Sequence, residues 1–161
     1  MTSIFKCFKN QKGTAFIEWL FILPMIIMVF SFGIEMGFAM YDFSTINYVA
    51  SSTVIEAARK GEFDDEIAVR NAEYLSNWTS RGRDSDIIRS DTPLVDPKRV
   101  VVWGPPSGNK FQRGQTITVG VSYPIEFKIF YMDALAHWII ADQKLALKAR
   151  ASALSEVYFE P

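Results

Sequence analysis

The stretch that decides the fold is KGTAFIEWLFILPMIIMVFSFGIEMGFAMYD, which covers residues 12–42. Between Trp19 and Tyr41 it contains a single charged residue, Glu35. About 20 mostly apolar residues are enough to cross the hydrocarbon core of a bilayer. A buried core helix of a soluble protein is the competing interpretation, but so many consecutive large apolar residues leave no polar face. The stretch therefore predicts a transmembrane helix.

Basic residues mark one side of this apolar run. Lys6, Lys9 and Lys12 precede it, whereas Asp42 follows it and the first basic residue beyond is Arg59. Positively charged flanks tend to stay in the cytoplasm. We therefore expect a single-pass protein of the cytoplasmic (inner) membrane, with its N-terminus in the cytoplasm and its C-terminal domain outside.

A cleaved secretory signal peptide is an alternative interpretation of the same run. Such peptides have an apolar core of about 7–15 residues and then a small-x-small cleavage site. The run here is longer, although Gly33 and Gly37 supply small residues near its end. The pattern at the beginning of the run argues against removal of the span.

That pattern is K-G-T-A-F-I-E at residues 12–18. Gly13 separates a basic leader from the apolar helix, and Glu18 follows it by five residues. Pro24 lies six residues after Glu18, and the run closes with G-I-E-M-G at 33–37. In these features the chain resembles the TadE-like family, minor pilins or pseudopilins of the tight-adherence (Tad, Flp) type IV pilus system.

The resemblance implies a plan for the whole chain. Residues 1–13 would be a leader cut between Gly13 and Thr14 by a prepilin peptidase, 14–61 a transmembrane and stem helix, and 62–161 an outer α+β domain. Its partners would be other pilins, pilus assembly proteins and the lipids of the cytoplasmic membrane. The function would be structural, in pilus assembly, with no enzymatic activity and no cofactor.

Two departures bear on the branch of the family. Major Flp pilins usually carry Tyr after the Glu and are much shorter, whereas this chain has Trp19, which favours a minor component. The residue after the cut would be Thr14 rather than the Phe common in type IVa pilins and type II secretion pseudopilins. A pseudopilin of a secretion or competence system remains an alternative, as does a signal-anchored membrane protein with an outer binding domain.

Glu18 has two interpretations. Cleavage would create an ammonium group at Thr14, and Glu18 of an incoming subunit could pair with that group on its neighbour, since a carboxylate in an apolar span is costly unless paired. Alternatively, Glu18 lies among the lipid headgroups, where the dipole at the helix N-terminus stabilises an acid.

Four further residues are candidates for roles in assembly. Gly33 and Gly37 form G-x-x-x-G, a spacing that permits close helix–helix contact, although glycine is frequent in membrane helices in any case. Pro24 removes one helical hydrogen bond, so we expect a kink there. Glu35 should lie near the outer interface, where it either reaches toward water or pairs inside an assembly.

The rest of the chain predicts a small α+β domain with a short antiparallel sheet. A second helix is expected from an Asp64 cap to about Trp78, with Ile67, Ala68, Leu75 and Trp78 buried. The remaining segments are a loop at 80–97, a strand at 100–103, a loop at 104–109, a strand at 115–123 with Ile117, Val119, Val121 and Tyr123 on one face, and a strand or helix at 144–152. Residues 125–141 are apolar but carry charges, which suits the core, a partner contact or the membrane surface.

Little in the sequence suggests chemistry. The net charge is −1, which gives no reason to expect a nucleic-acid partner. His137 is the only histidine, and with Asp133 it offers only two of the ligands that a metal site needs. The only cysteine, Cys7, lies in the leader, and no glycine-rich phosphate loop is present. We therefore expect no catalytic, metal or cofactor site.

Overall fold

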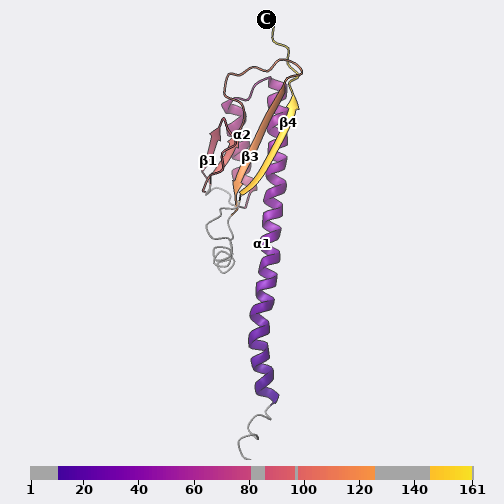
Figure 1. Ribbon diagram of the computed structural model, residues 1–161, viewed down its shortest axis with the longest axis vertical. Helices are drawn as coiled ribbons and strands as arrows, with labels where there is room; N and C mark the ends of the chain where they lie inside the picture. The colour runs from indigo at the N-terminus through magenta and orange to yellow at the C-terminus, as the bar shows by residue number, and fades with distance from the viewer. Residues whose placement is uncertain (1–10, 81–85, 97, 126–145, 161) are drawn as a thin grey trace, which may run out of the picture.

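The computed structural model describes residues 11–80, 86–96, 98–125 and 146–160. It shows an α+β chain with a long N-terminal helix, a second helix and a four-stranded mixed sheet (Figure 1). The elements are α1 (Gln11–Lys60), α2 (Asp65–Trp78), β1 (Ile87–Ser90), β2 (Val100–Trp103), β3 (Thr116–Pro124) and β4 (Ala146–Leu154). The predictions for Cys7, Asp133, His137 and nearly all of 125–141 concern residues outside the described ranges.

Helix α1 is one continuous element of 50 residues, which covers nearly all of the segment predicted as transmembrane and stem helix. It continues through Pro24 without a break. It ends before Gly61, whose φ of 76° lies in the left-handed region that glycine tolerates best. A Cβ atom at Gly61 would also come within 2.8 Å of the Phe159 ring. Both the turn and the packing therefore require glycine here.

Helix α2 begins at the predicted cap and runs back along α1. The Asp64 carboxylate accepts a hydrogen bond of 3.0 Å from the backbone N–H of Ile67, which satisfies a donor in the first turn of the helix. Farther along, Arg70 contacts Glu56 of α1 at 2.6 Å. The chain thus folds into a helical hairpin above the apolar half of α1.

The predicted buried face of α2 is correct except at its end. Ile67, Ala68 and Leu75 are buried, but Trp78 is 55% exposed. Trp78 lies on the same side of α2 as Ile67 and Asn71, but it is the last residue of the helix and extends past the end of the core, beyond Leu75. The ring stacks on Tyr74 instead, with centroids 5.9 Å apart. The fourth buried position is Asn71, which donates to the carbonyl of Ile67 at 2.7 Å.

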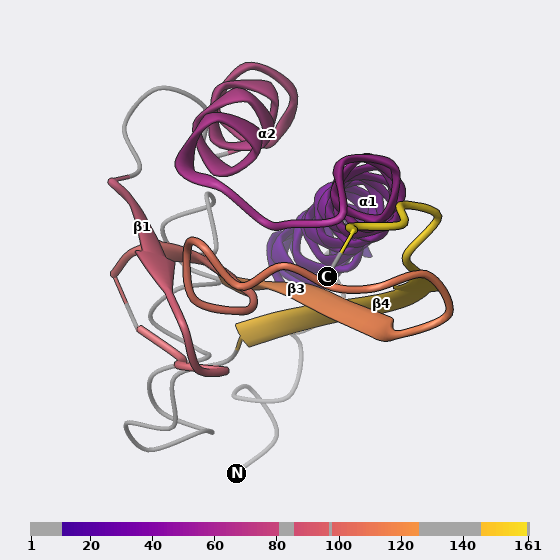
Figure 2. The same cartoon turned by 90° about the horizontal axis from the view of Figure 1, so that it is seen from above.

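The sheet has the order β1-β2-β3-β4, and both helices cover one of its faces (Figure 2). The β2–β3 and β3–β4 pairs are antiparallel, but β1 pairs with β2 in parallel, with Ile87 opposite Val100. The expectation of a purely antiparallel sheet was therefore wrong, as was the assignment of 80–97 entirely to a loop. In the segment predicted as strand or helix at 144–152, the described residues 146–152 belong to strand β4.

Arg89 connects the polar segment that forms β1 to other parts of the domain. Its guanidinium bonds Asp65 at the start of α2 and Ser107 in the loop after β2. It also lies over the Phe63 ring, 4.9 Å from the ring centroid. These contacts join β1 to the α1–α2 turn. They are long-range, so the composition of the segment does not reveal them.

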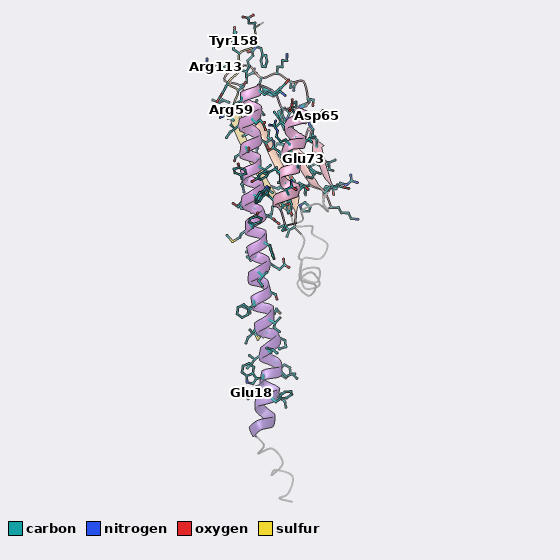
Figure 3. All side chains as sticks on the ribbon, turned by 180° about the vertical axis from the view of Figure 1, so that it is seen from behind. Glu18, Arg59, Asp65, Glu73, Arg113 and Tyr158 are labelled. Carbon is teal, nitrogen blue, oxygen red and sulfur yellow. The ribbon has the colours of Figure 1, made fainter. Side chains whose placement is uncertain are left out.

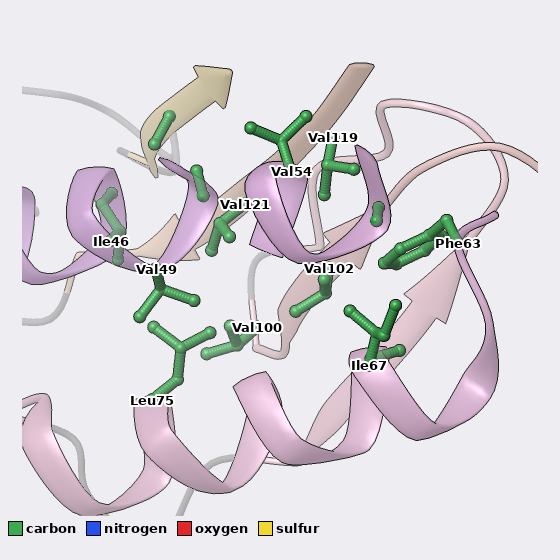
Figure 4. Close-up of a cluster of buried hydrophobic side chains, with 14 of the residues drawn as sticks. Ile46, Val49, Val54, Phe63, Ile67, Leu75, Val100, Val102, Val119 and Val121 are labelled. Carbon is green, nitrogen blue, oxygen red and sulfur yellow. The ribbon is translucent and has the colours of Figure 1, made fainter. Parts of the chain in front are cut away.

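The core lies between the sheet and the upper half of α1 (Figure 4). As predicted, alternate residues of β3 point into it. They meet a helical stripe on α1 and the buried face of α2. The core residues include Ile46, Val49, Val54, Phe63, Ile67, Leu75, Val100, Val102, Ile117, Val119, Val121 and Tyr123. The second half of α1 is thus a core element of the domain.

Candidate membrane-spanning and assembly surface

The first half of α1 exposes large apolar side chains over most of its circumference. Phe21 is 73% exposed and Phe30 is 70% exposed. By length and composition α1 could cross a membrane. Contiguous exposed apolar surface of this size marks contact with lipid or protein. The exposed residues include Phe16, Ile17, Trp19, Leu20, Phe21, Ile22, Leu23, Met25, Ile27, Val29, Phe30, Phe32, Ile34, Met36, Phe38 and Met40.

The residues predicted at the junction lie at the beginning of this surface. Gly13 and Thr14 fall in the first turn of α1. Glu18 is exposed on the next turn (Figure 3). Among the described residues, no ion pair or hydrogen bond of the Glu18 side chain occurs within the subunit. Its position is thus open to either of the two interpretations, a neighbouring subunit or the headgroups.

Gly33 and Gly37 lie exposed on the same half of the helix. A Cβ atom built at either position would have no atom within 4 Å. Neither glycine is therefore needed for packing inside the subunit. The open surface over G-x-x-x-G remains accessible to another helix.

Glu35 lies apart from the two glycines. It is only 5% exposed, and Ser31, one turn before it, is 8% exposed. Seven residues after Glu35 comes Asp42, which is also buried, and then the core residues Ile46 and Val49 continue along the same side of α1. Glu35 thus belongs to the side of α1 that faces the domain, so it does not reach freely toward water.

Asp42 is the site residue that sequence analysis missed. The backbone N–H of Ser80 donates to its carboxylate at 2.7 Å, and the Ser80 hydroxyl donates to the other carboxylate oxygen. In the sequence Asp42 counted only as a charge beyond the span. Its position one turn before the buried Ile46 was the available sign that it would be buried as well.

An aromatic row connects the two helices. Tyr48 of α1 lies 5.7 Å from Tyr74 of α2, measured between ring centroids, and Tyr74 stacks on Trp78. Below Trp78 a groove opens between the helices. It is lined by Ile34, Gly37, Phe38, Tyr41, Asn77, Trp78, Thr79 and Ser80. The end of the domain nearest the apolar half of α1 therefore carries an exposed aromatic and apolar surface.

Comparison of the chain with protein-family models, with curated proteins and with solved structures gives no match. Within the described ranges, no group of three or more His, Cys, Asp or Glu side chains is placed to hold a metal ion. The features that a function can be built on are the apolar surface of α1, its glycines and Glu18.

Proposed function

We propose that this chain is a membrane-anchored structural subunit, a minor pilin or pseudopilin of the TadE-like kind, which takes part in assembly of a Tad-type pilus. One observation carries the proposal. The exposed apolar half of α1 continues without interruption into a half that forms the core of a small α+β domain. A subunit built this way can leave the membrane and enter a filament while its domain stays intact.

The junction supports the same proposal. Gly13 and Glu18 have the spacing of a prepilin peptidase site, and Glu18 has an exposed position at the start of the apolar surface. In this proposal the peptidase cuts after Gly13 on the cytoplasmic face, and the domain lies outside. The subunit acts through contacts with other subunits rather than through catalysis.

A signal-anchored protein with an outer binding domain is the second candidate. The groove beside Trp78 favours it, because it gives the domain a surface of its own. The two candidates differ in processing, since only a pilin-like subunit needs the cut after Gly13.

The test is the N-terminus of the membrane-bound protein, produced with and without a Tad-type prepilin peptidase. With the peptidase, sequencing should begin at Thr14, and without it at the start of the leader. Gly13→Leu should block the change, whereas Ala15→Gly should leave it intact. An intact leader in the presence of the peptidase contradicts the pilin proposal, and a terminus near residue 38 indicates an ordinary signal peptide.

A further inference from the structure

We infer that the C-terminal end of α2 docks on the outer surface of the bilayer, with Trp78 and Tyr41 at the level of the lipid headgroups. The inference rests on the proposal that α1 spans the membrane, and it adds to that span a direct contact between the domain and the lipid. Three observations carry it: the height of Tyr41 along α1, the direction of α2, and the make-up of the groove between them.

The height of Tyr41 follows from helix geometry. Trp19 and Tyr41 are 22 residues apart in one continuous helix, which at about 1.5 Å per residue is about 33 Å. The hydrocarbon core of a bilayer is about 30 Å thick. Both side chains are exposed, Trp19 by 62% and Tyr41 by 49%. Since Trp and Tyr concentrate at the two membrane–water interfaces, Tyr41 marks the outer interface.

Helix α2 returns to this same level. Arg70 contacts Glu56, and farther along α2 the Tyr74 ring lies beside Tyr48. The contacts thus descend α1 as the chain advances along α2. The last of them joins the residue after Thr79 to Asp42, the neighbour of Tyr41. The two helices are therefore antiparallel, and the C-terminus of α2 points at the bilayer surface.

The groove has a composition that suits this position. Its membrane side is formed by Ile34, Gly37 and Phe38, which continue the apolar surface of α1. Its outer side carries the exposed amide side chain of Asn77. An apolar floor below a polar rim matches the boundary between acyl chains and headgroups. Because the apolar floor of the groove continues the apolar surface of α1, we infer that lipid occupies the groove rather than a soluble protein.

Asp42 would otherwise oppose this placement, since a carboxylate is costly close to hydrocarbon. Here it is 4% exposed and accepts two hydrogen bonds from Ser80. The first acid beyond the span is thus turned away from the lipid and satisfied inside the domain. Trp78, in contrast, is 55% exposed beside it.

The experiment uses tryptophan fluorescence of the full chain in phosphatidylcholine vesicles. Three variants each keep one tryptophan, Trp19, Trp78 or Trp103, and carry Phe at the other positions, including Trp138. Some vesicles contain phospholipid brominated on acyl carbons close to the headgroup, a quencher that acts only at short range. Trp103 is the control outside the membrane, because its neighbour Gly104 packs on Phe63 at the far end of the domain.

We expect the brominated lipid to quench Trp78 to the same fractional extent as Trp19 and to leave Trp103 unchanged. Quenching of Trp19 without quenching of Trp78 would overturn the docking and leave the membrane span intact; this is also the result if a second copy of the chain fills the groove. Absence of quenching at both positions would refute the span itself, and with it the docking.

A spin-label experiment that needs no Trp→Phe substitution tests the docking independently, in case those variants misfold. The chain has one cysteine, so Cys7→Ser combined with Asn77→Cys gives a single exposed site at the groove for a nitroxide spin label. Its collision rate with lipid-soluble oxygen should exceed that with a water-soluble nickel complex. The matched label at Asn109, in the loop after β2, should show the opposite order. Equal behaviour of the two labels contradicts the docking.

Discussion

Asp42 and Ser80 are 38 residues apart in the chain, yet the Ser80 backbone N–H donates to the Asp42 carboxylate at 2.7 Å. The Ser80 hydroxyl donates to the same carboxylate, which is buried. Hydrogen bonds to a charged group contribute about 1.5–3 kcal/mol each. This contact therefore fixes the lower end of α2 against the stem.

Asp42→Ala should detach the C-terminal end of α2 from α1. The substitution leaves the Ser80 N–H without this acceptor, so we expect a loss of about 2–3 kcal/mol of folding free energy. Asp42→Asn keeps one acceptor oxygen and should lose less. Thermal unfolding in detergent micelles measures the loss, and amide hydrogen exchange at 75–80 localises it.

The matched control for Asp42→Ala is Glu73→Ala, which removes an exposed acid from α2 itself. We expect it to change the free energy of unfolding by no more than about 0.5 kcal/mol. Equal effects of the two substitutions would show that the contact with Ser80 has no special weight.

Gly120 in β3 is required by its neighbours. A Cβ atom there would come within 2.3 Å of the Trp103 ring and 2.7 Å of the backbone carbonyl oxygen of Ala149. The carbonyl belongs to the paired strand β4 and cannot move aside without breaking the ladder. Gly120→Ala should therefore cost about 1–3 kcal/mol through overpacking.

The contrasting substitution is Gly33→Ala, where a Cβ atom meets nothing within 4 Å. Alanine is favoured over glycine in a helix by about 1 kcal/mol, so this variant should be as stable as the parent or more so. Both variants are compared by thermal unfolding in the same detergent. A Gly120→Ala protein as stable as Gly33→Ala would refute the packing of Trp103 across the sheet.

The elements predicted from sequence are those set by local patterns. Alternation along β3, the apolar run of α1 and the cap at Asp64 each follow from a few neighbouring residues. Strand β1 was missed because Arg89 connects it to the α1–α2 turn and the following loop through long-range contacts, which a local pattern does not reveal. Trp78 was misplaced because its position on the helix does not reveal that the core ends before the last turn of α2.

The candidate site likewise contains features that follow from local sequence and features that depend on long-range contacts. The exposed apolar half of α1, the G-x-x-x-G pattern and Glu18 can all be recognised in one stretch of sequence. The burial of Asp42 depends on Ser80 returning to the stem after a whole helix, which a local pattern does not encode. The aromatic row from Tyr48 to Trp78 likewise exists only once α2 folds back.

The Asp64 cap should make stability depend on pH. Burial raises the pKa of Asp64, but hydrogen bonds from the Lys60 ammonium and the Ile67 N–H outweigh it, so the pKa lies below its ordinary value of 3.8. A lowered pKa means that folding stabilises the ionised form of the Asp64 carboxyl group more than its protonated form. The stabilisation is therefore present above about pH 4 and is lost as the pH falls through the folded-state pKa.

Asp64→Ala should consequently destabilise the protein most at neutral pH, by about 0.5–2 kcal/mol for the lost cap. The difference from the parent should shrink as the pH drops below about 4. Asp64→Asn, which can still cap, should keep most of the stability without the acid dependence. Unfolding followed by circular dichroism from pH 3 to 7 checks both; a difference that grows in acid contradicts the assignment.

The last prediction concerns Glu18, the exposed acid at the start of the apolar surface. Membrane insertion needs only the apolar run, so Glu18→Leu should still insert, and more easily than the parent because a charge is removed. If Glu18 pairs with the Thr14 ammonium of a neighbouring subunit, the variant leaves that ammonium unpaired in a contact of low dielectric. Breaking a buried pair on one side costs about 3–5 kcal/mol, enough to abolish a weak assembly step.

A Glu18 among the headgroups would instead lose only its interaction with the helix dipole, about 0.3–1 kcal/mol, which is too little to stop assembly. The two magnitudes separate the interpretations. The measurement is whether Glu18→Leu, first verified as inserted and cut after Gly13, still co-purifies with pilus components and supports piliation. Phe16→Leu, a nearby exposed apolar position, is the control and should assemble normally. Normal piliation by Glu18→Leu would make Glu18 an interfacial residue and remove the pairing mechanism from the proposed function.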